Sequence, residues 1–64
     1  MKYYRNIHAG NENELVKVDE INNKAWYIPP YYYGEKIWVS VKPYQIKFEN
    51  LKEITKAEAF IEIL

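Results

Sequence analysis

Residues 26–34 read Trp26-Tyr27-Ile28-Pro29-Pro30-Tyr31-Tyr32-Tyr33-Gly34, and five of these nine side chains are aromatic. The prolines and the glycine predict a turn or loop, because proline cannot donate a hydrogen bond to a sheet and glycine tolerates unusual backbone conformations. A loop normally lies on the surface and is polar. This aromatic loop is therefore either folded back as a lid on the core or displayed as a contact surface, and the sequence leaves both readings open.

Three strands are predicted before or within this segment. The first spans residues 3–8 and the second spans residues 15–21, with a cluster of turn-forming residues at 9–13 between them. Asn22-Asn23 is typical of a tight hairpin, so a third strand at residues 25–28 is expected to pair back on the second.

Two further strands are predicted after the loop. Residues 36–42 alternate most clearly, with Ile37, Val39 and Val41 on one face and Trp38 on the other. Pro43 ends this run, and residues 44–49 alternate again, which predicts a fifth strand.

A single helix is predicted at about residues 56–64. Thr55 and Glu58 have the spacing of a capping box, which marks a helix start. The apolar positions that repeat with helical spacing are expected to dock on the sheet. These positions are Ala57, Phe60, Ile61 and Leu64.

The element order predicts one mainly β, small α+β domain over residues 1–64. We expect a five-stranded curled antiparallel sheet, or a partly open SH3-like barrel, with one C-terminal helix. The likeness to SH3 is one of architecture, because the acidic and aromatic signatures of peptide-binding SH3 domains are absent from the sequence. A domain of 64 residues has a thin core, and without cysteine the bulky aromatic side chains are its remaining source of buried area.

Composition argues against several classes of partner. Nine basic and nine acidic residues cancel, so the chain lacks a general positive field for nucleic acid or anionic membranes. No apolar run approaches the roughly 20 residues of a membrane span, and residues 1–5 lack the apolar core of a signal peptide. We expect a cytoplasmic protein with no membrane partner. Eight lysines against one arginine are consistent with an AT-rich bacterial or phage genome.

Catalytic and metal-binding patterns are weak. His8 is the sole histidine, and nothing in the sequence places Ser40, Thr55 or a tyrosine beside it as a nucleophile. One histidine with scattered carboxylates does not make a metal-ligand set, and residues 11–14 lack the spacing of a calcium loop. The sequence predicts a protein that is not an enzyme and uses no metal or cofactor.

Trp38 carries the main functional question. If Ile37, Val39 and Val41 face the core, Trp38 faces away from them and is either covered by its own chain or is a contact residue. Trp26 alternates with Ile28 and is expected to point inward.

The leading hypothesis is a non-enzymatic binding module that recognises a protein or peptide through an aromatic surface patch. The predicted binding residues are Tyr31, Tyr32, Tyr33, Trp38, Lys36 and Lys42, with Tyr4 and Tyr27 as lesser candidates. Self-association through this patch is a special case, because a small domain gains stability from a dimer interface. The alternative is a small nucleic-acid-binding barrel, in which the same aromatic rings stack on bases and local lysines contact phosphates. A third reading gives the aromatic residues a purely structural role.

Overall fold

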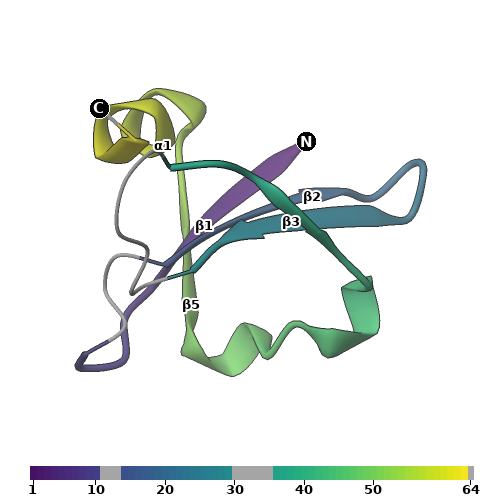
Figure 1. The fold of residues 1–64 in the computed structure, drawn as a ribbon, viewed down its shortest axis with the longest axis horizontal. Helices are drawn as coiled ribbons and strands as arrows, with labels where there is room; N and C mark the ends of the chain where they lie inside the picture. The colour runs from purple at the N-terminus through teal and green to yellow at the C-terminus, as the bar shows by residue number, and fades with distance from the viewer. Residues whose placement is uncertain (11–13, 30–35, 64) are drawn as a thin grey trace.

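The computed structural model describes residues 1–10, 14–29 and 36–63. Its strands are β1 (Lys2–Asn6), β2 (Leu15–Asp19), β3 (Lys24–Ile28), β4 (Val39–Val41) and β5 (Leu51–Ile54). They form one antiparallel sheet in the order β4-β3-β2-β1-β5. Two short 3-10 helices, η1 (Pro43–Gln45) and η2 (Phe48–Asn50), lie between β4 and β5, and the helix α1 (Lys56–Ile63) follows β5. The sheet is curled but not closed (Figure 1), which confirms the predicted mainly β fold class with one C-terminal helix.

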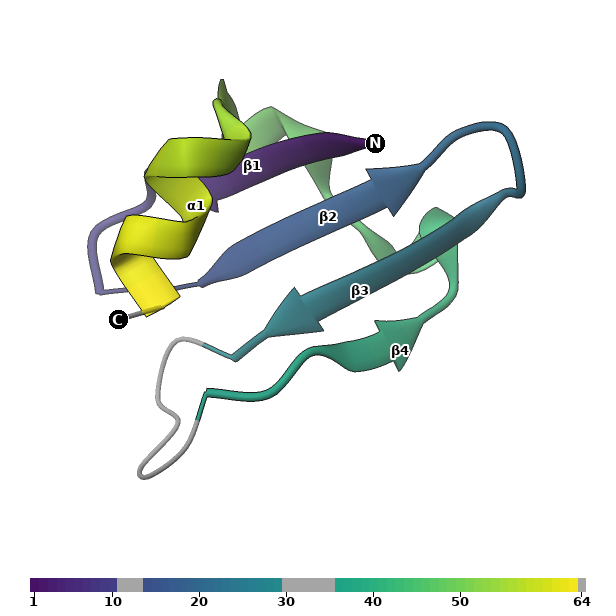
Figure 2. The ribbon, with the colours of Figure 1, turned by 90° about the horizontal axis from the view of Figure 1, so that it is seen from above.

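The sheet carries a different cover on each face (Figure 1, Figure 2). Helix α1 packs on one face, which we call the helix face, and the segment with η1 and η2 crosses the other, the turn face. Directly opposite residues in antiparallel strands share a face. The register therefore aligns one row across the helix face, made of Ile54, Tyr3, Lys17, Trp26 and Ser40. The neighbouring row on the turn face is Glu53, Tyr4, Val16, Tyr27 and Val39.

Each face has its own small core. The helix-face core consists of the buried side chains Leu15, Ile28, Ile54 and Ala59. The turn-face core consists of Val16, Val18 and Ala25, beneath the partly buried Ile46 and Leu51. The neighbouring residues Leu15 and Val16 enter opposite cores because successive side chains of a strand point to opposite faces. The centre of the sheet is therefore buried from both sides.

The predicted hairpin between β2 and β3 forms, but its turn spans residues 20–23, so Glu20 and Ile21 lie in the turn and not in the predicted second strand. Asn23 has a positive φ of 52°, a conformation that asparagine tolerates better than most residues. Asn22 donates from its backbone amide and from its side-chain amide to the Asp19 carboxylate, at 3.2 and 2.8 Å. These local bonds fix the register of the hairpin.

The prediction of a strand over residues 44–49 is wrong. Residues 43–45 and 48–50 form 3-10 turns instead, with local bonds from the Gln45 amide to the Lys42 carbonyl oxygen (2.9 Å) and from the Asn50 amide to the Lys47 carbonyl oxygen (3.3 Å). These bonds occupy the backbone groups that a strand would offer to the sheet. The fourth strand is also shorter than predicted, and the fifth forms at Leu51–Ile54.

Helix α1 docks through a face that only partly matches the one predicted. Ala59 is buried and Ile63 packs against the helix-face core, whereas Ile61 is 69% exposed. Phe60 is 46% exposed, but its ring packs edge to face on that of Tyr3 in the sheet, with centroids 6.2 Å apart. Ala57 is also exposed. The rotation of α1 is set by its one-residue link to β5, and the small side chain of Ala59 allows the helix to approach the sheet closely. Leu64, the last position of the predicted stripe, lies outside the described residues.

The core assignment can be tested with two matched substitutions. We expect Ile28→Val to lower the free energy of unfolding by about 1 kcal/mol, because it removes a methyl group from a core position. The side chain of Ile28 is 1% exposed, whereas that of Ile21 in the β2–β3 turn is 95% exposed. Ile21→Val should therefore change the free energy of unfolding by less than about 0.5 kcal/mol. Urea unfolding followed by tryptophan fluorescence measures both, and equal losses would contradict this core.

The predicted capping box is present at the start of α1. The Thr55 hydroxyl accepts from the Glu58 amide at 3.1 Å, and the Glu58 carboxylate accepts from the Thr55 amide at 3.0 Å. The bond from the Thr55 amide, with that from its side chain, holds the pKa of the Glu58 carboxyl below its ordinary value. A lowered folded-state pKa contributes stability above the unfolded pKa, and this stability is lost as the pH falls through the folded pKa.

We expect Glu58→Ala to destabilise the protein at pH 7, and the difference from wild type to shrink as the pH falls below about 4. Glu58→Gln is the control, because its amide oxygen can still accept from Thr55 but cannot titrate. Thermal unfolding between neutral and acid pH measures the effect. A wild-type advantage over Glu58→Ala that stays constant down to about pH 3 would disprove the assigned role of the charge.

Candidate binding groove

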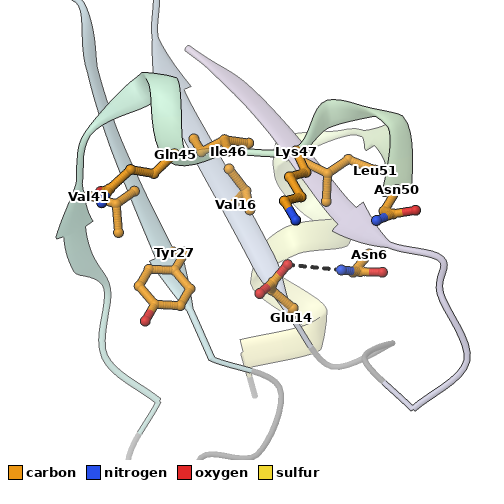
Figure 3. Close-up of a pocket in the computed structure, with 10 residues that line it drawn as sticks. All are labelled: Asn6, Glu14, Val16, Tyr27, Val41, Gln45, Ile46, Lys47, Asn50 and Leu51. Atoms are coloured by element: carbon orange, nitrogen blue, oxygen red, sulfur yellow. Dashed lines mark hydrogen bonds between the residues drawn. The ribbon is translucent and has the colours of Figure 1, made fainter.

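A groove of about 500 Å³ lies on the turn face, between the curled sheet and the segment that contains η1 and η2 (Figure 3). The residues that line it are Asn6, Glu14, Val16, Tyr27, Val41, Gln45, Ile46, Lys47, Asn50 and Leu51. They come from all five strands, from the residue before β2 and from the η1–η2 segment. The groove is therefore a product of the tertiary fold.

The local chemistry of residues 42–50 forms one wall of the groove. Pro43 cannot extend the hydrogen bonding of β4, and the Gln45 side chain accepts from the Lys42 amide at 3.1 Å. The chain therefore turns away from the sheet edge and crosses the turn face, where Ile46 packs on the turn-face core. Local hydrogen bonds hold most of this segment in turns, and only at its end does the Asn50 carbonyl oxygen accept from the Ile7 amide after β1, at 2.9 Å, so the segment crosses the sheet and leaves a space beneath.

The groove has an apolar floor and one strongly polar end. The floor is made of Val16, Tyr27, Val41, Ile46 and Leu51, all buried or half-buried. Figure 3 shows Tyr27 and Val41 towards one end and Asn6, Glu14 and Asn50 towards the other. Such a combination of apolar surface and few oriented polar groups is typical of ligand sites.

Asn6 organises the polar end. It is 7% exposed, and its side-chain amide donates to the Glu14 carboxylate at 3.0 Å while its side-chain oxygen accepts from the His8 amide at 2.7 Å. The Asn6 backbone amide also donates to the Glu14 carbonyl oxygen at 3.1 Å. These bonds tie the end of β1 to the start of β2 and hold the Glu14 carboxylate at the groove.

Two opposite charges line this groove. Glu14 and Lys47 both contribute to its lining. Among the described residues, ion pairs join Lys2 to Glu20 and Arg5 to Glu62, away from the groove. The groove therefore offers an anionic and a cationic group to an occupant.

Exposed aliphatic surface continues from the groove to the edge of the sheet. Val39, which stands beside Tyr27 in the turn-face row, is 41% exposed, and Ile37 is 50% exposed. The expectation that these two residues face the core is wrong: Val39 opens the edge strand β4, Ile37 lies before this strand, and neither packs against the turn-face core. Val41, the third residue of the predicted face, does pack against the turn-face core.

Trp38 lies on the opposite, helix face. Its half-buried indole packs against the helix-face core, and its ring centroid lies 6.5 Å from that of Tyr3. The Lys17 Nζ atom lies 4.6 Å from the Trp38 ring centroid and 5.1 Å from that of Trp26. Trp26 shares this face with Ile28, as predicted. The chain therefore covers part of Trp38 and leaves part accessible.

Lys36 and Lys42 are both exposed. The Lys36 ammonium donates to the Glu62 carbonyl oxygen near the end of α1 at 2.7 Å, which brings it to the helix face with Trp38. Lys42 lies immediately after β4. The remaining predicted contact residues, Tyr31, Tyr32 and Tyr33, lie outside the described residues. The contact role of this set stays a prediction.

The sequence alone did not predict this groove. Of the lesser candidates, Tyr27 lines it, and Tyr4 packs edge to face on Phe48 with ring centroids 5.4 Å apart. The polar residues Asn6 and Glu14 carry no motif of their own. One signal in the sequence did argue against a strand over residues 44–49. Pro43 precedes them, and proline favours the first position of a helical turn.

No family model matches this chain, and no curated protein or solved structure matches it either. Within residues 1–10, 14–29 and 36–63, no three histidine, aspartate or glutamate side chains are grouped so that they could hold a metal ion. None of the described helices combines the length and apolar character needed to cross a membrane.

The role of Asn6 can be tested against a matched exposed asparagine. We expect Asn6→Ala to lower the free energy of unfolding by roughly 1–3 kcal/mol, because it removes two hydrogen bonds at a buried polar position. Asn22→Ala removes one side-chain hydrogen bond, to Asp19, at an exposed turn and leaves the bond from the Asn22 backbone amide in place, so we expect less than about 1 kcal/mol. Urea unfolding measures both, and hydrogen exchange of the His8 amide should accelerate in Asn6→Ala. Unchanged exchange at His8 would contradict this organising role.

Proposed function

We propose that this protein is a non-enzymatic binding module that recognises an extended segment of a protein or peptide in the turn-face groove. The observation that supports this function best is the groove itself, with its apolar floor, its fixed carboxylate and its lysine. Apolar contacts in the floor supply affinity, and the few polar groups at its margin orient the bound segment.

The adjacent edge strand favours an extended polypeptide as the ligand. Within the described part of the chain, β4 pairs with β3 alone, so its other edge has backbone amide and carbonyl groups directed away from the sheet. An extended peptide can bond to such an edge and place alternate side chains on one face. Those side chains would meet Val39 and Val41 and then the floor of the groove.

The predicted aromatic patch is compatible with this mode of binding. Tyr27 already contributes a half-buried ring to the groove. A tyrosine offers a rigid amphipathic contact at low cost in side-chain entropy. The contribution of Tyr31, Tyr32, Tyr33 and Trp38 to the same partner is part of the proposal.

Selection from a library of linear twelve-residue peptides, followed by NMR titration of the best binder, tests this function. We expect chemical-shift changes at Val16, Tyr27 and Val41. Val39→Asp should weaken binding about tenfold or more, because it places a charge on the apolar approach to the groove. Ile61→Asp is the matched control, since Ile61 is also an exposed aliphatic residue but lies on α1, and it should change affinity less than about twofold. Peptides that shift only helix-face residues, or a library that yields no binder, would refute the proposal.

A further inference from the structure

We propose that the helix face carries a second, independent binding site, for single-stranded nucleic acid. The site lies on the half of this face that α1 leaves open, on the opposite side of the sheet from the peptide groove (Figure 2). It goes beyond the proposed peptide binding and does not depend on it.

Charge is unevenly distributed between the two faces, although the whole chain is neutral. The register places Lys17 beside Trp26 and Lys24 two residues before it on the same face, and Lys36 reaches this face at the end of α1. Lys42 borders it beside Lys24. Net charge alone therefore conceals a local cluster of ammonium groups, which is the electrostatic signature of phosphate binding.

The carboxylates of the helix face are already engaged. Asp19 lies at the hairpin end, where hydrogen bonds from the Asn22 side chain and then its backbone hold the pKa of the Asp19 carboxyl below its ordinary value. Glu62 pairs with Arg5 at 3.4 Å. Neither carboxylate forms an ion pair with Lys17, Lys24 or Lys42, although Asp19 stands opposite Lys24 in the β2–β3 register. These three ammonium groups can therefore contact an anion, whereas that of Lys36 already donates to the Glu62 carbonyl oxygen.

A hollow of about 300 Å³ lies at the end of this cluster that is formed by Lys24 and Lys42. Its lining includes Lys24 and Lys42, the indole of Trp26 and the hydroxyl-bearing Ser40. Two cations, one aromatic ring and one hydroxyl group match the needs of a single nucleotide, which has an anionic phosphate and a flat base.

The tryptophans extend the site along the sheet. The Lys17 ammonium lies over both indole rings, at 5.1 Å from Trp26 and 4.6 Å from Trp38. Both indoles are half-buried, so each is held in place by the fold and keeps part of its ring accessible. Unpaired bases can stack on such fixed rings while the intervening ammonium contacts the backbone.

Single strands fit this surface better than a duplex. In a duplex the bases are stacked on one another and present only their edges, so the indole rings would gain nothing from them. The basic cluster alone would then attract a duplex no better than any other polyanion. The combination of rings and lysines therefore selects unpaired bases.

Fluorescence anisotropy with a labelled twelve-nucleotide oligothymidine tests the site. We expect binding at about 20 mM salt that weakens by about a hundredfold at about 200 mM salt, as contacts to three phosphates predict. The double variant Lys24→Gln/Lys42→Gln should bind about tenfold more weakly and show a shallower salt dependence. The double variant Lys2→Gln/Lys47→Gln removes the same charge from the turn face and should change affinity less than about twofold.

Two readouts decide the outcome. Oligothymidine should quench tryptophan fluorescence, and Trp26→Phe should reduce both affinity and quenching without unfolding the protein. The proposal is overturned if wild type does not bind at low salt, if the two lysine double variants weaken binding equally, if fluorescence is unchanged on binding, or if a duplex of the same length binds as tightly. None of these outcomes affects peptide binding on the turn face.

Discussion

The whole structure depends on the burial of one strand from both sides. Leu15 and Val16 are neighbours in β2, yet they enter opposite cores. A chain of 64 residues cannot build a single thick core. This chain instead builds two thin ones that share the central strands, and it covers one with a helix and the other with a pair of 3-10 turns. Each cover is too small to seal its face, and both candidate sites occupy the surface that the covers leave open.

The two covers leave surfaces of different chemical character. The η1–η2 segment is held mainly by local hydrogen bonds as it crosses the sheet, and it leaves a groove with an apolar floor and a carboxylate held by Asn6. Helix α1 approaches closely through Ala59 and leaves the other half of its face to Trp26 and Trp38, with Lys17 between them. The same sheet therefore displays an aliphatic, mixed-charge surface on one side and an aromatic, cationic surface on the other.

Local signals in the sequence predicted much of the fold. The Asn22-Asn23 hairpin, the capping box of Thr55 and Glu58 and the helix that follows were identified correctly, because each depends on neighbouring residues. The strand predicted over residues 44–49 failed because local hydrogen bonds around Pro43 outweigh the alternation of Tyr44, Ile46 and Phe48.

The side of each element that packs on the core, and the geometry of the candidate sites, were harder to predict, because both depend on contacts between residues far apart in the sequence. Hydrophobicity selected Phe60 and Ile61 as the docking side of α1, but close approach to the sheet required Ala59. The alternation correctly placed Trp38 opposite Ile37 and Val39, but it assigned the wrong side to the core, since Ile37 and Val39 are exposed and Trp38 packs against the helix-face core. Asn6 and Glu14 belong to a site only after the turns have crossed the sheet above them.

The pairing of β1 with β5 has a consequence for biosynthesis. Tyr3 lies opposite Ile54, so β1, the first of the described strands in the chain, finds one of its two partners only when nearly all of the described chain has been made. Until then β1 has an unpaired edge, which another nascent chain could occupy. Long-range pairing of this kind also slows folding. We therefore expect the pairing of β1 with β5 to form late among the described elements, with the hairpin of β2 and β3 as the part that can form first.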